Sequence, residues 1–88
     1  RLRAGDRAAF AVLVRQHQGR LLRLAGIFCA GRATAEEVVQ EVWLAALTGL
    51  DGFRGEVPVG AWLSGICANK ARTRAVRDGR SVSLDAME

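Results

Sequence analysis

The chain has 88 residues, half of them apolar, and a formal net charge of +4. This length predicts one domain with its own core, and no apolar run approaches the roughly 20 residues that cross a membrane. Cys29, Cys67 and His17 lack both the density of a disulfide framework and the spacing of a zinc site, so we expect a reduced, cytoplasmic protein without metal or other cofactor.

The N-terminal part is predicted to be helical from Asp6, the expected N-cap. Apolar residues recur at helical spacing from Phe10 onward. Gln18-Gly19 either breaks or bends this pattern, and a break makes a second helix over about 20–30. Gly31 then provides a natural stop.

The next helix is predicted over 34–48, because Thr34 and Glu37 have the spacing of a capping box. Its apolar residues follow a period of 3.6 and predict a wide buried face, formed by Val38, Val39, Val42, Trp43, Ala46 and Leu47. Thr48-Gly49 is expected to end it.

A glycine-containing loop is predicted to lead through Pro58 into a last helix, which starts near Val59 or Ala61 and ends at Asp78-Gly79. Gly65 within this helix costs roughly 1 kcal/mol relative to alanine, so we expect a packing reason for it. The fold class predicted is therefore all-α, a compact bundle of four helices. We expect residues 1–80 to form the domain and 81–88 to begin a linker, and we interpret the chain as part of a longer protein.

Charge is unevenly distributed along these elements. Residues 1–31 contain six arginines and one acid, residues 32–57 contain five acids and two arginines, and residues 69–80 contain five cations and one acid. An acidic middle between basic ends predicts two kinds of partner surface, one of them for nucleic acid.

The outer side of the third predicted helix is the first candidate surface. If its apolar face is buried, Glu37, Gln40, Glu41 and Leu44 face outward, and an exposed leucine among acids and an amide is typical of a docking patch. On the residues alone an ordinary solvated helix face is favoured over this interpretation.

The loop and the basic end of the last helix are the second candidate surface. The loop residues Phe53, Arg54, Gly55 and Glu56 combine an aromatic ring, a cation and backbone donors, which can hold an unstacked base. In the helix, an amide suited to a base edge precedes a series of cations suited to phosphates: Asn69, Lys70, Arg72, Arg74 and Arg77. The alternatives are a ring that fills the core, an amide that bonds internally and cations that only compensate the helix dipole. No catalytic triad spacing or phosphate loop is present, so an enzyme is not expected.

Three stretches of the chain, in order, resemble the region 2 domain of bacterial sigma factors of the extracytoplasmic-function class. They are GDRAAFAVLVRQH near the start, ATAEEVVQEVWLAAL in the centre and FRGEVPVGAWLSGICAN before the basic end. Together they cover nearly the whole chain, from Gly5 to about Arg77.

The resemblance implies a helical domain that docks on the clamp helices of the RNA polymerase β′ subunit through Glu37, Gln40, Glu41 and Leu44. It also implies recognition of the promoter minus-ten element as single strand, with base capture by the loop and contacts from Asn69 and the cations after it. Family members commonly have an anti-sigma partner that covers these surfaces. Trp62 matches an aromatic of the family pattern, and we assign it to the core.

The chain departs from the family pattern at three positions. Ala68 stands where an arginine is common, Thr73 where an aspartate is common, and Val14 where an aromatic is usual. These departures leave an alternative, a sigma-like interaction module held by an anti-sigma factor without productive DNA reading.

Overall fold

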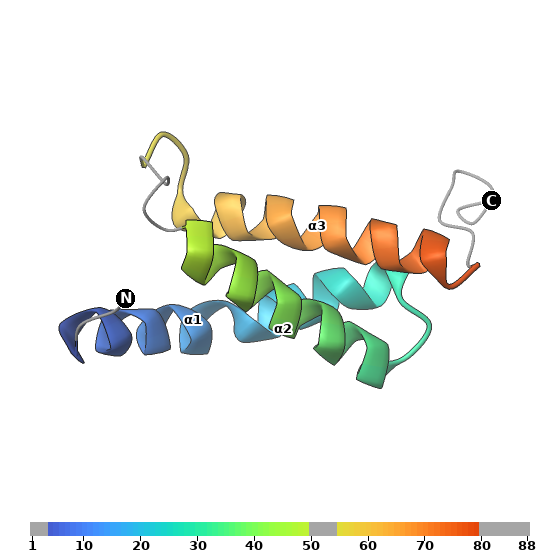
Figure 1. Cartoon of the computed structure of the whole chain (residues 1–88), viewed down its shortest axis with the longest axis horizontal. Coiled ribbons are helices and arrows are strands. Elements are labelled where there is room, and N and C mark those ends of the chain that lie inside the picture. Colours follow the sequence, from blue (N-terminus) through green and yellow to red (C-terminus); the bar gives the residue numbers. More distant parts are fainter. Residues whose placement is uncertain (1–3, 50–54, 80–88) are drawn as a thin grey trace.

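The computed structural model describes residues 4–49 and 55–79, with side chains from residue 7 onward. The described residues form three helices and no strand: α1 (Ala4–Phe28), α2 (Arg32–Gly49) and α3 (Val59–Arg77). In Figure 1, α1 and α3 run in the same direction along the molecule, and α2 runs in the opposite direction. Each helix packs on both others. The all-α class is confirmed, and the predicted bundle of four helices is wrong.

The difference in helix number arises at Gln18-Gly19, which lies inside α1 and does not interrupt it. A helical glycine costs only about 1 kcal/mol, and the tertiary packing on both sides of it exceeds that cost. Leu21 and Ala25 are completely buried after the glycine, and the Gln18 side chain accepts a hydrogen bond of 2.7 Å from Trp43 Nε1. These contacts need the chain to continue as helix.

The predicted start signals are also displaced. α1 begins at Ala4, so Asp6 lies in its first turn and is not the N-cap. α2 begins at Arg32, and the Ala35 amide donates to the Gly31 carbonyl at 3.0 Å, so Thr34 lies within the helix. The predicted capping box is therefore wrong, and the Glu37 carboxylate contacts α3 instead. The start of α3 at Val59, after Pro58, and its end before Asp78-Gly79 agree with the prediction.

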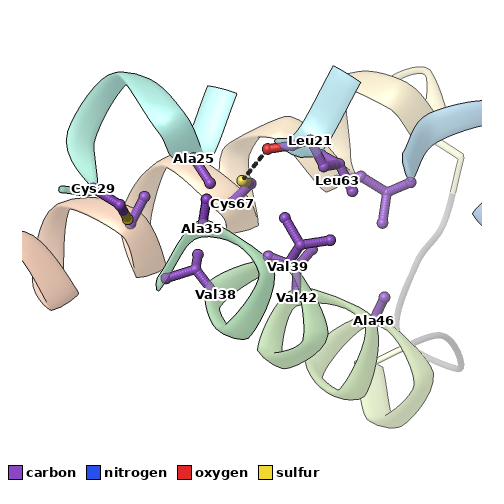
Figure 2. Close-up of a cluster of buried hydrophobic side chains, with 11 residues drawn as sticks. Leu21, Ala25, Cys29, Ala35, Val38, Val39, Val42, Ala46, Leu63 and Cys67 are labelled. Carbon is purple, nitrogen blue, oxygen red and sulfur yellow. Dashed lines mark hydrogen bonds between the residues drawn. The ribbon is translucent and has the colours of Figure 1, made fainter. Parts of the chain in front are cut away.

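The core is built from small side chains. Figure 2 shows alanine, valine and cysteine from all three helices meeting around Leu21 and Leu63. Larger side chains pack around this centre only partly buried, including Trp43, which meets the Phe10 ring edge-on at 5.6 Å. Small residues in the centre let the helices approach closely, and the aromatic rings close the periphery. Of the predicted apolar face of α2, Leu47 is 37% exposed and lies at its edge.

Gly65 has no packing reason in this fold. A Cβ atom placed on it would meet no other atom within 4 Å. The expectation from the sequence is wrong here, because the position is on the exposed side of α3.

Candidate docking and nucleic-acid interface

The first candidate surface lies on the outer side of α2. Val38, Val39 and Val42 are buried, and this rotation leaves Glu37, Gln40, Glu41 and Leu44 exposed. Leu44 has 64% of its surface in contact with solvent. We refer to these four exposed residues as the α2 patch. It has the composition predicted for it, an apolar residue among carboxylates and an amide.

The cationic end of α3 lies beside the α2 patch. Glu41 of α2 faces a groove of about 310 Å³ that α3 lines with Asn69, Lys70, Thr73, Arg74 and Arg77. A neighbouring hollow of about 300 Å³ is lined by Glu41, Leu44 and Lys70, together with Ala45 and Thr48. The two candidate surfaces are therefore contiguous, and we call the first of these hollows the α2–α3 groove.

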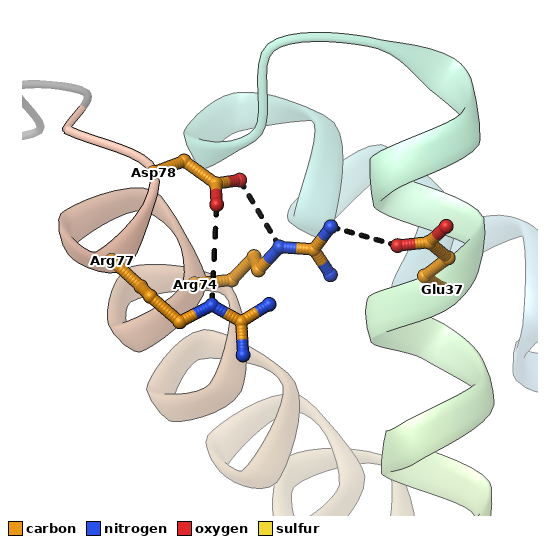
Figure 3. A network of polar contacts seen from close by, with 4 residues as sticks. All are labelled: Glu37, Arg74, Arg77 and Asp78. Carbon is orange, nitrogen blue, oxygen red and sulfur yellow. Dashed lines mark hydrogen bonds and ion pairs between the residues drawn. The ribbon is translucent and has the colours of Figure 1, made fainter.

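Arg74 joins the two surfaces through a network of ion pairs (Figure 3). Its Nη2 donates to Glu37 Oε1 at 2.7 Å and its Nε donates to Asp78 Oδ2 at 3.0 Å. The hydrogen bond that Arg74 donates to Glu37 raises the pKa of Arg74 above its usual value. Burial opposes this increase, and the hydrogen bond that Arg74 donates to Asp78 adds to it, so the guanidinium stays charged. With 18% of its side chain exposed, Arg74 is mostly enclosed by its own partners.

Arg77 and Lys70 have different surroundings. Arg77 is 69% exposed, and its Nε lies 4.0 Å from the second oxygen of Asp78. Lys70 lines both hollows and is half-buried. Of the cations that line the groove, Lys70 and Arg77 can reach a ligand without breaking the pair between Arg74 and Glu37.

Arg72 does not belong to the α2–α3 groove. Its guanidinium carbon lies 5.8 Å from the centre of the Phe28 ring, at the end of α1. This contact is a cation–π interaction on the side of α3 that packs on α1. The predicted set of DNA-binding cations is therefore divided between two sides of α3.

The predicted base-capture loop is described only in part, since Phe53 and Arg54 lie outside the described residues. Gly55 and Glu56 are exposed, and Gly55 has a φ of 75°, a conformation that favours glycine. The predicted linker, 81–88, also lies outside the described residues.

Two residues of the site were not predicted from the sequence. Asp78 was interpreted only as a helix stop, yet it binds Arg74 and approaches Arg77. The spacing of four residues between Arg74 and Asp78 is a signal that could have identified this pair. Thr73 was noted only as a departure from a family pattern, and it lines the α2–α3 groove.

Within the described residues, no three His, Cys, Asp or Glu side chains are grouped so that they could hold a metal ion. Both cysteines are buried, and neither forms a disulfide. None of the helices in the described ranges is both long enough and apolar enough to cross a membrane.

A family model described as sigma-70 region 2 matches residues 13–81 of the chain. The chain is 35% identical over 80 residues to the RNA polymerase sigma-H factor of Pseudomonas aeruginosa, which covers 91% of this chain and 42% of that protein. It is 34% identical over 91 residues to the ECF RNA polymerase sigma-E factor of Escherichia coli, covering 100% of this chain and 47% of that protein. The chain thus spans about half the length of the curated relatives that it matches. No solved structure matches the chain.

Proposed function

Because the chain belongs to the sigma-70 region 2 family, in its extracytoplasmic-function class, we propose that it recognises a promoter minus-ten element and docks on RNA polymerase core to initiate transcription. The observation that carries the proposal is the contiguity of the α2 patch with the cationic α2–α3 groove. A domain that binds polymerase and DNA together needs two adjoining surfaces of unlike chemistry.

The α2 patch is the proposed contact with the clamp helices of the β′ subunit. Leu44 supplies the apolar centre, and Glu37, Gln40 and Glu41 supply a polar, negative rim that suits a basic partner helix. Burial of one exposed leucine on docking contributes roughly 1.5–3 kcal/mol, so Leu44 is the residue whose loss weakens docking most.

The groove and the loop before α3 are the proposed contacts with single-stranded DNA. Lys70 and Arg77 are assigned to phosphates, and Asn69 to a base edge or a backbone oxygen. Arg74 lines the same groove, but it shares its charge with two carboxylates and contributes less. Phe53, Arg54, Gly55 and Glu56 remain the proposed base-capture loop, and Arg72 is assigned to a peripheral backbone contact at most.

Docking is tested by comparing Leu44→Ala with Ile27→Ala, because both remove most of a four-carbon side chain that is about two-thirds exposed on a helix. We expect Leu44→Ala to weaken binding to polymerase core about tenfold or more, and Ile27→Ala on α1 to leave it unchanged. Glu41→Lys should also weaken it, since the reversed charge repels a basic partner. Equal affinities for the parent and all three variants would reject the α2 patch as the docking surface.

A second candidate function is an interaction module that does not read DNA. It is favoured by the pairing of Arg74 with Glu37 and Asp78, because these carboxylates compete with phosphate for its charge. The salt dependence of binding to forked minus-ten DNA, measured with polymerase present, separates the two. A slope near zero would favour the interaction module, because phosphate contacts release counterions.

A further inference from the structure

The rotation of α2 about its own axis determines the direction in which the α2 patch points. The buried residues of α2 are all alanine or valine: Ala35, Val38, Val39, Val42 and Ala46. Side chains this short form low ridges, which restrain the rotation of a helix less than long interlocking side chains do. The orientation of the α2 patch therefore depends on further contacts at the edges of α2.

Hydrogen bonds hold α2 at both of its edges. On the side of α1, Trp43 Nε1 donates to Gln18 Oε1 at 2.7 Å. On the side of α3, Glu37 Oε1 accepts a hydrogen bond of 2.7 Å from an arginine of α3 (Figure 3). At 3.6 residues per turn, Gln40 and Leu44 lie on the arc of α2 between these two edges. The two contacts therefore bracket the centre of the α2 patch.

A docked partner disturbs these two contacts unequally. The Glu37 side chain is 61% exposed and is itself a proposed contact with a basic partner helix. Trp43 packs against the core and meets the Phe10 ring edge-on, with the ring centres 5.6 Å apart. Its bond to Gln18 is partly buried and joins two uncharged groups, so a basic partner competes for it less than for a carboxylate. We therefore expect the contact with α1 to persist when a partner binds.

We infer that Gln18 is a positioning residue of the α2 patch. Its hydrogen bond with Trp43 fixes the rotation of α2, and with it the direction in which Gln40 and Leu44 face RNA polymerase core. Gln18 lies on α1, outside the patch, and acts through Trp43. The inference rests on the proposed function, and it adds that part of the docking affinity depends on a residue of another helix.

The test measures the affinity of the full chain for RNA polymerase core. Gln18→Leu retains the approximate size of the side chain and removes the acceptor, and Gln16→Leu makes the same change at an exposed position of α1. We expect Gln18→Leu to weaken docking about three- to tenfold, the effect of one lost hydrogen bond, and Gln16→Leu to leave it unchanged. Gln18→Glu retains an acceptor oxygen, so it should dock with the affinity of Gln16→Glu, which adds the same charge.

Two further measurements distinguish positioning from a general loss of stability. Ile66→Val, at a partly buried position of α3, lowers the free energy of unfolding by a comparable amount and should leave docking unchanged, because the chain stays folded. In ¹H–¹⁵N spectra of the free chain, Gln18→Leu should shift the indole N–H of Trp43 and the backbone amides of Gln40 and Leu44. Gln16→Leu should leave these resonances in place. Urea unfolding checks the stability of each variant.

Three results would overturn the inference alone. The first is parent-like docking by Gln18→Leu in an experiment in which Leu44→Ala weakens docking. The second is an equal loss of docking for Gln18→Leu and Ile66→Val, which would make the effect one of stability. The third is the absence of shifts at the Gln40 and Leu44 amides in Gln18→Leu. Parent-like docking by Leu44→Ala is a different failure, because it would reject the proposed docking surface together with the inference.

Discussion

At the scale of single residues, the cations of α3 differ more in their surroundings than in their charge. Arg74 has two carboxylate partners and little exposure, whereas Arg77 is 69% exposed and only approaches Asp78 at 4.0 Å. A phosphate can pair with Arg77 directly, but it must compete with Glu37 and Asp78 for Arg74. The two arginines are therefore expected to differ in function.

We predict that Arg77→Ala reduces the salt dependence of DNA binding by the polymerase-bound protein, by about 0.7 in the slope of log affinity against log salt for one lost phosphate contact. Arg74→Ala should change this slope less and lower the thermal midpoint more, because it removes contacts within the fold. Arg15→Ala, an exposed cation on α1, is the control for the loss of one charge. A larger slope change for Arg74→Ala than for Arg77→Ala would contradict this ranking.

The thiol of Cys67 has a clear pH signature. It is completely buried and donates to the Leu21 carbonyl at 3.5 Å (Figure 2). Burial, together with nearby Cys29, raises the pKa of Cys67 to about 11, from 9.0 for an ordinary thiol. The protonated thiol therefore stabilises the fold fully below pH 9, and this contribution disappears as the pH rises toward 11.

Between pH 8 and pH 10.5, the parent chain should lose roughly 2 kcal/mol more of its free energy of unfolding than Cys67→Ala does. Urea unfolding at the two pH values measures this difference, and the comparison with Cys67→Ala cancels the effects of pH that both proteins share. Native Cys67 should also resist alkylation at pH 8 until urea unfolds the chain. The same pH dependence in parent and variant would show that Cys67 is not the titrating group.

At the scale of helices, the sequence predicted the faces better than the boundaries. The period of the apolar residues correctly placed Val38, Val39 and Val42 inside and Glu41 outside, because this periodicity directly reflects burial. Caps and breaks were predicted less well. The helix-breaking tendency of Gly19 and the capping tendency of Thr34 each contribute little free energy. Tertiary contacts of Gln18 and Glu37 therefore determine that α1 continues through Gly19 and that Thr34 lies inside α2.

The helical glycines provide a test of this interpretation. Gly26→Ala and Gly65→Ala should each raise the free energy of unfolding by roughly 0.5–1 kcal/mol, since a Cβ atom at either position meets nothing within 4 Å. Gly60→Ala is the matched control, because its Cβ would lie 3.1 Å from an Arg20 nitrogen and 3.2 Å from a His17 carbon. Urea unfolding should show no gain at Gly60. Equal gains at all three positions would mean that this close approach of α1 and α3 has no energetic effect.

At the scale of the whole molecule, the ion pair between Glu37 and Arg74 could not be predicted from the sequence. The two residues are 37 positions apart, and helical periodicity places each on a face of its own helix without saying which faces meet. Both surfaces were predicted, but their contact depends on how α2 packs on α3. The consequence is that one carboxylate of the proposed polymerase contact holds one cation of the proposed DNA contact (Figure 3).

This shared pair predicts that docking and DNA binding are coupled. Glu37 cannot pair fully with both Arg74 and a basic partner helix, so a partner that engages Glu37 removes one of the two carboxylates that compete with a phosphate for Arg74. Glu37→Gln should mimic that release, and we expect it to raise the affinity of the free chain for single-stranded minus-ten DNA about two- to fivefold at low salt.

Glu36→Gln is the matched control, because it removes the same charge one residue away, where the carboxylate pairs with Arg32 at 3.1 Å. The affinity for DNA should be measured with and without a β′ clamp-helix fragment. In the parent and in Glu36→Gln, the fragment should increase the affinity, while in Glu37→Gln, and in Glu37→Gln combined with Arg74→Gln, most of this increase should be lost. If Glu37→Gln and Glu36→Gln raise the DNA affinity of the free chain equally, the effect is one of net charge, and the Glu37–Arg74 pair is only a structural link between α2 and α3.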